Sequence, residues 1–96
     1  MAKVARDRLE AVRRYLQEVF PDWALADSWD DDREAQTFML KKPRESLHLL
    51  KVSRAVLEQH PPSKLSTMLE GHQVASALRK AVKHRLILTQ RGLLLL

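Results

Sequence analysis

The chain has 96 residues, enough for one domain and too few for two, so we expect a single domain over residues 1–96. Apolar residues make up 45% of the chain and charged residues 30%, a balance typical of globular proteins rather than disordered ones. The absence of cysteine excludes disulfides, thiolate catalysis and Cys-ligated metals, and it fits a cytoplasmic location. No apolar run approaches the roughly 20 residues of a membrane span, so we expect no membrane partner.

Charge is unevenly distributed along the chain. The formal net charge is +5, but residues 22–36 hold six acidic residues and only Arg33, a local balance of −5 that leaves +10 for the remainder. The last 26 residues contain no acidic residue and five basic ones, Arg79, Lys80, Lys83, Arg85 and Arg91. Such a segment attracts phosphate polymers or an acidic protein surface.

The first predicted element is an amphipathic helix over residues 3–20. Apolar residues recur there at spacings of three and four, and Leu9, Val12 and Leu16 lie on the same stripe. Pro21 ends the helix, because proline disfavours helical geometry in the preceding residue.

Three strands are predicted next, over residues 23–29, 35–42 and 46–52. Trp23, Leu25 and Trp29 alternate onto one side of the first strand. The segments between these strands are short and polar, which indicates an antiparallel meander whose first turn is acidic.

The second half of the chain is expected to begin with a short helix over residues 53–59, which Ser53 can cap. The Pro61-Pro62 pair separates it from a second helical pattern. One helix over residues 64–83 is the simpler interpretation of its continuous apolar phase, and a break at Gly71 is the alternative. Residues 86–89 then form a strand, which residues 93–96 extend as a hairpin or an edge.

These elements predict an α+β fold: an N-terminal helix, a three-stranded antiparallel meander, two helices and a C-terminal strand or hairpin, with the helices on one face of the sheet. The predicted core consists of Leu9, Val12, Leu16, Phe20, Leu25, Phe38, Leu40, Leu47, Leu49, Leu65, Leu69, Leu78, Val82 and Ile87.

No pattern indicates an enzyme. The four histidines, at positions 48, 60, 72 and 84, lack the spacing of a metal site, and no serine lies in a known nucleophile motif. The acidic residues 30–34 lack the glycine and final glutamate of a calcium loop and are expected to form a solvated turn. We therefore predict no catalytic residue, no metal and no cofactor.

Nucleic-acid binding through the basic C-terminal region is the leading functional hypothesis, with Arg79, Lys80, Lys83, Arg85 and Arg91 as phosphate contacts. Arg13 and Arg14 extend the patch if the first helix lies nearby. Two arrangements are compatible with this role: a winged helix over residues 63–96, and a frame over residues 3–80 that follows the element order of a double-stranded RNA-binding domain but lacks its basic signature. All five aromatic residues lie in the first 38 positions, far in sequence from the basic run, which disfavours a single-strand binder.

The alternative hypothesis is a protein–protein adaptor or inhibitor, which uses the same basic patch and the acidic turn against an acidic partner. The apolar residues 93–96 would form an exposed edge, and pairing with a second copy in a homodimer would protect it.

Overall fold

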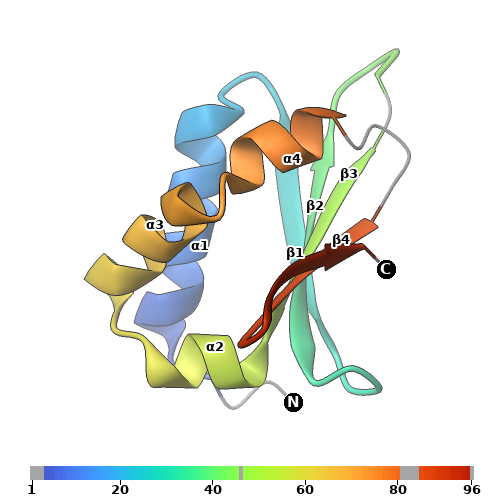
Figure 1. Cartoon of the computed structure of the whole chain (residues 1–96). Coiled ribbons are helices and arrows are strands. Elements are labelled where there is room, and N and C mark those ends of the chain that lie inside the picture. The colour runs from blue at the N-terminus through green and yellow to red at the C-terminus, as the bar shows by residue number, and fades with distance from the viewer. Residues whose placement is uncertain (1–3, 46, 81–84, 96) are drawn as a thin grey trace.

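The computed structural model describes residues 4–45, 47–80 and 85–95 of the chain. The elements follow in the order α1 (Arg6–Val19), β1 (Ala24–Asp30), β2 (Ala35–Lys41), β3 (His48–Ser53), α2 (Arg54–Gln59), α3 (Pro62–Gly71), α4 (Val74–Lys80), β4 (Arg85–Thr89) and β5 (Gly92–Leu95). The α+β class is confirmed, and the helices lie on one side of the sheet (Figure 1).

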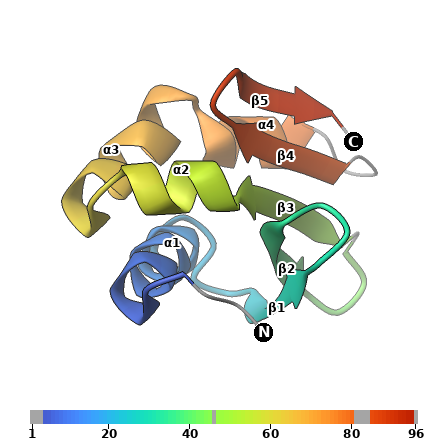
Figure 2. The same ribbon diagram turned by 90° about the horizontal axis from the view of Figure 1, so that it is seen from below.

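The sheet has five strands in the order β1-β2-β3-β4-β5, as Figure 2 shows from below. The first three strands pair antiparallel, as the meander prediction requires, and β5 returns antiparallel to β4. β4, however, pairs parallel with β3, so the sheet is mixed. Parallel neighbours need a long crossover, and helices α2, α3 and α4 lie within it.

Local sequence accounts for several boundaries. The Ser53 hydroxyl accepts a hydrogen bond from the Val56 amide and caps α2. Pro62 begins α3, where its missing amide proton costs no helical hydrogen bond. Gly92 adopts a φ of +116° where the β4–β5 turn enters β5, a conformation that other residues rarely adopt.

The prediction of one helix over residues 64–83 is wrong, because α3 and α4 are separate helices. α3 ends at Gly71, and the chain turns at Gln73, whose φ is +54°. The apolar phase continues across this turn because Leu69 before it and Val74 after it are both fully buried in the same core. Val82, at the end of the predicted helix, lies outside the described residues.

The core lies between the helices and the inner face of the sheet. Its largest completely buried side chains include Leu16 of α1, Phe38 of β2, Leu50 of β3, Leu69 of α3 and Leu88 of β4. Most of the predicted core residues belong to this cluster, and Leu25 packs against it while partly buried.

Three predicted core residues lie elsewhere. Leu47 precedes β3 and keeps 39% of its surface exposed. Leu49 is buried but lies on the outer face of the sheet. Its neighbour Leu50 pairs with Phe38, whose side chain is in the core, so Leu50 faces inward and Leu49 faces outward. Ile87 also faces outward, since its neighbours Leu86 and Leu88 fill the core.

In the part of the chain that the structure describes, no helix combines the length and the apolarity needed to cross a membrane.

Candidate nucleic-acid interface

Several segments bring cationic side chains to the same end of the sheet, the upper end in Figure 1. The register places the end of β2, the start of β3 and the start of β4 at this end, since Leu40 pairs with His48 and Leu49 with Arg85. The β2–β3 turn and the last turn of α4 lie here too (Figure 1). We call this region the basic end, and its cations are Lys41, Lys42, Arg44, Arg79, Lys80 and Arg85.

A pocket of about 320 Å³ opens at the basic end, which we call the end pocket. It lies between the C-terminus of α1, the segment leading into β1, the β2–β3 turn, the start of β3 and the end of α4. Its lining residues are Val19, Phe20, Pro21, Asp22, Trp23, Glu45, His48 and Arg79. The pocket therefore combines aromatic walls with two carboxylates, one imidazole and one guanidinium group.

Three rings form the wall of the end pocket. The Trp23 indole stacks on the His48 imidazole, with centroids 4.5 Å apart and planes inclined by 26°. The Phe20 ring meets Trp23 edge-on, with centroids 5.8 Å apart, and is tilted by 51° against His48 at 5.4 Å. Such edge-to-face and offset contacts suit the ring quadrupoles and make this wall a preformed surface.

Two cations of the basic end lie over these rings. Lys42 Nζ is 5.9 Å from the Trp23 centroid, and the Arg79 guanidinium is 5.0 Å from the Phe20 centroid. Arg79 Nη2 also donates to the carbonyl oxygen of Val19 at 2.8 Å, which satisfies one of the free carbonyls at the end of α1. The fold thus combines aromatic rings and cations that are far apart in the sequence.

His48 is a buried imidazole with unmet hydrogen-bonding capacity. Only 5% of the residue is exposed, and its Nδ1 has no hydrogen-bond partner among the described residues. Burial lowers the pKa of His48 below its ordinary value, the charge on Arg79 lowers it further, and Glu45 opposes both effects. The ring is therefore neutral near pH 7.

The five predicted phosphate contacts are not all together. Arg79 and Lys80 are neighbours in the last turn of α4, and Arg85 begins β4 at the same end, on the outer face of the sheet. Arg91 lies in the β4–β5 turn, beyond a strand that extends about 14 Å from its first to its last residue. Lys83 lies outside the described residues.

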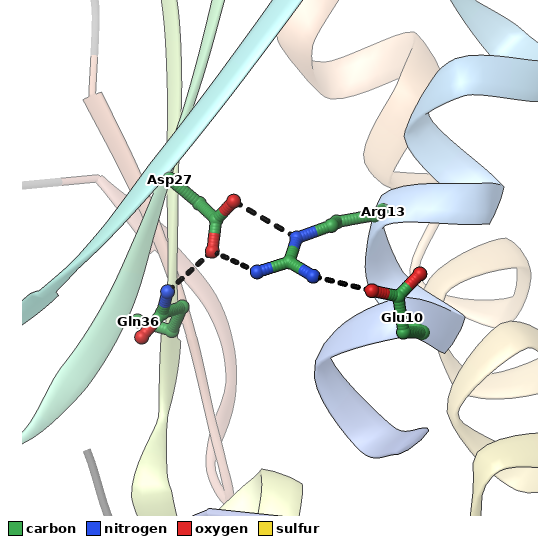
Figure 3. Close-up of polar contacts among 4 residues, drawn as sticks. All are labelled: Glu10, Arg13, Asp27 and Gln36. Atoms are coloured by element: carbon green, nitrogen blue, oxygen red, sulfur yellow. Dashed lines mark hydrogen bonds and ion pairs between the residues drawn. The ribbon is translucent and has the colours of Figure 1, made fainter. Parts of the chain in front are cut away.

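Arg13, considered above as an extension of the patch, is engaged inside the molecule (Figure 3). Its Nε and Nη2 donate to the two carboxylate oxygens of Asp27 at 2.8 and 2.7 Å, and its Nη1 donates to Glu10 at 2.6 Å. Asp27 also accepts a hydrogen bond from Gln36 Nε2 at 2.5 Å. The hydrogen bond from Arg13 lowers the pKa of Asp27, although burial opposes it, and this network connects α1 to the sheet.

Sequence reasoning missed Lys41, Lys42 and Arg44 as members of the basic end. The sequence shows these cations as a dense run, Lys41-Lys42-Pro43-Arg44. Only the tertiary structure shows that this turn lies at the same end of the sheet as the last turn of α4 and the start of β4. The winged-helix arrangement is only partly present, because the β4–β5 hairpin is not a separate wing and continues the main sheet.

Residues 4–45, 47–80 and 85–95 contain no group of three or more His, Asp or Glu side chains placed to hold a metal ion.

No protein-family model, no curated protein and no solved structure matches this chain.

Proposed function

We propose that this protein is a small non-enzymatic accessory or regulatory protein that binds nucleic acid through its basic end. The observation that carries the proposal is the convergence of six cations from the end of β2, the β2–β3 turn, the last turn of α4 and the start of β4. Only two carboxylates, Asp22 and Glu45, line the pocket beside them. A cluster of this sign raises the local concentration of phosphate polymers and speeds their association.

The residues assigned to phosphate are the cations exposed at the rim of this end: Lys41, Arg44, Lys80 and Arg85. Lys42 and Arg79 lie over aromatic rings and are not assigned to phosphate. Lysine and arginine contacts to phosphate position a protein on a nucleic acid without reading its sequence. We therefore expect binding that depends strongly on salt, because each contact releases condensed counterions.

One turn at the opposite end of the sheet is acidic, which helps to orient the protein on a polyanion. The turn between β1 and β2 exposes Asp31, Asp32 and Glu34, which we call the acidic turn. The register places it at the far end of β2 from Lys41. A polyanion is repelled by the acidic turn and attracted by the basic end, so the protein approaches with the basic end first.

Fluorescence anisotropy of labelled duplex DNA, single-stranded DNA and duplex RNA at two salt concentrations tests the proposal. The informative variant is the triple substitution Lys41→Ala, Lys80→Ala and Arg85→Ala. Its matched control, Arg6→Ala with Arg33→Ala and Lys64→Ala, removes the same charge from exposed positions elsewhere.

The basic-end variant should lose at least tenfold in affinity, and its log–log salt dependence should become shallower by up to about 2.7 if all three side chains contact duplex phosphates. The control should lose much less. Equal losses in both variants would show that overall charge, and not the basic end, drives binding. No binding by the wild type at low salt would refute the proposal.

A protein-interaction role is the second candidate, and the two edges of the sheet favour it. The β1 edge carries Asp27 and Asp30, and charged residues of this kind discourage pairing with another chain. β5, from Gly92 to Leu95, contains no charged residue, and Leu94 is 46% exposed. Under this proposal a second copy pairs with β5, and the basic end then receives an acidic partner. Sedimentation at several concentrations tests it: Leu94→Lys should abolish concentration-dependent association, and a monomeric wild type would contradict the homodimer.

A further inference from the structure

We propose that the end pocket receives one unpaired nucleobase bearing an exocyclic amino group, so that the protein prefers single strands, loops or frayed ends to a continuous duplex. This inference rests on the proposed function and names its ligand class. The volume of about 320 Å³ is at the lower end of the range for small-ligand pockets. A pocket of this size suits one planar ring system and is too small for paired bases.

The aromatic wall provides the stacking surface. Trp23 is fixed by His48 on one side and by the edge contact with Phe20, so its indole is held in place before any ligand arrives. Lys42 is the only described cation over this indole; it does not line the pocket, and its long flexible side chain can reach a phosphate of a strand whose base occupies the pocket. Stacking of a base on one aromatic side chain typically changes affinity about tenfold or more.

The charges divide the site into two parts. The rim holds four exposed cations, whereas the pocket holds the carboxylates of Asp22 and Glu45 against one guanidinium group, that of Arg79, which already donates to the Val19 carbonyl oxygen. A phosphate group is repelled by these carboxylates and belongs on the rim. A neutral ring with an N–H₂ group can donate to a carboxylate, so a base fits the pocket while the flanking phosphates contact the rim.

The same donors and acceptors predict which bases are preferred. Cytosine, adenine and guanine each carry an exocyclic amino donor, whereas thymine presents carbonyl acceptors and a methyl group instead. Thymine offers the carboxylates only its ring N3–H, which lies between two carbonyl acceptors, and is disfavoured.

The test compares labelled dC12 and dT12 single strands and a duplex of equal length by anisotropy. Trp29→Phe leaves Trp23 as the sole tryptophan, so its emission reports stacking directly. We expect binding of dC12 about tenfold tighter than that of dT12 or the duplex, with quenching of Trp23 emission by dC12. Free cytidine monophosphate should bind at least a hundredfold more weakly than dC12, since it lacks the phosphates that span the rim.

The decisive variant is Asp22→Asn with Glu45→Gln, two exposed side chains whose replacement should leave the fold intact. Removal of two negative charges should strengthen binding of dT12, whereas the preference for dC12 should disappear. The matched control, Asp31→Asn with Asp32→Asn in the acidic turn, should strengthen binding of both strands equally.

The outcomes separate this inference from the proposed function. Nucleic-acid binding that requires the basic end, but with equal affinities for dC12, dT12 and duplex and no quenching, overturns the pocket assignment alone. Retention of the dC12 preference in the Asp22→Asn, Glu45→Gln variant also overturns it. Absence of all nucleic-acid binding refutes both.

Discussion

Removal of the Asp27 carboxylate should be among the most costly polar substitutions in this protein. Asp27 accepts two hydrogen bonds from Arg13 and one from Gln36, and its side chain is only 13% exposed. In Asp27→Ala, Gln36 Nε2 loses the carboxylate oxygen that accepts its hydrogen bond. Because Gln36 is only 4% exposed, leaving this donor without an acceptor costs about 1–3 kcal/mol. Arg13 is 28% exposed and keeps its ion pair with Glu10. Loss of the Arg13–Asp27 interaction should therefore cost about as much as loss of a surface ion pair, about 0.2–1 kcal/mol.

Together these contributions predict a loss of about 1–4 kcal/mol in the free energy of unfolding. For a domain of this length that corresponds to a fall in melting temperature of about 5–30 °C. Urea denaturation followed by circular dichroism measures the loss, and Glu10→Ala is the control, because it removes only the exposed ion pair and should cost about 0.5 kcal/mol.

Acid sensitivity provides an independent test of the same pair. Because the pKa of Asp27 is lowered in the folded state, its stabilising effect is complete above the ordinary carboxyl pKa of about 3.9 and is lost as pH falls through the folded-state pKa. The stability difference between the wild type and Asp27→Asn should therefore be constant above about pH 5 and shrink below pH 4. A cost for Asp27→Ala no greater than that for Glu10→Ala would refute the assignment of this network as a connection between α1 and the sheet.

Three further predictions concern the core, a helix cap and the buried imidazole. Phe38→Ala should cost about 3–5 kcal/mol in urea denaturation, since Phe38 is completely buried, and a loss below about 1.5 kcal/mol would contradict its place in the core. Ser53→Ala should cost about 1 kcal/mol by the same measurement through loss of the α2 cap, with no effect expected if the cap is absent in solution. Because burial lowers the pKa of His48, the free energy of unfolding of the wild type should fall as pH drops below about 6.5. Measured at pH 7.5 and 5.5, this fall should be smaller in His48→Phe than in the wild type. An identical fall in both proteins would mean that His48 is not responsible.

Local patterns predicted the elements where one period was unambiguous. The 3.6-residue stripe identified α1, and Pro21 placed its end within two residues of Val19. Strict alternation correctly placed Leu25 and Trp29 on one side of β1, and the structure shows that both pack against the core. Ser53 was identified as a cap because a hydroxyl before an apolar helical segment has a direct backbone partner.

Local patterns failed where alternation was misleading or absent. Leu47-His48-Leu49 alternates apolar and polar residues and favoured the wrong parity, whereas pairing with β2 shows that His48 and Leu50 share the inward face. In β4, the equally apolar neighbours Leu86, Ile87 and Leu88 left the parity ambiguous. The turn at Gln73 was hidden because the apolar phase continued through it.

The sequence by itself determined the α+β class, the charge asymmetry and the periodic faces of α1 and β1, because each depends on residues that are neighbours along the chain. Only the tertiary structure decided the parallel pairing of β4 with β3 and the grouping of Lys42, Arg79 and Arg85 at one end. It also placed Arg79 over the ring of Phe20, 59 positions earlier in the chain, and built the end pocket between them. Contacts of this kind depend on strand register and on the path of the helical crossover, which are set by the packing of the whole core rather than by any local pattern.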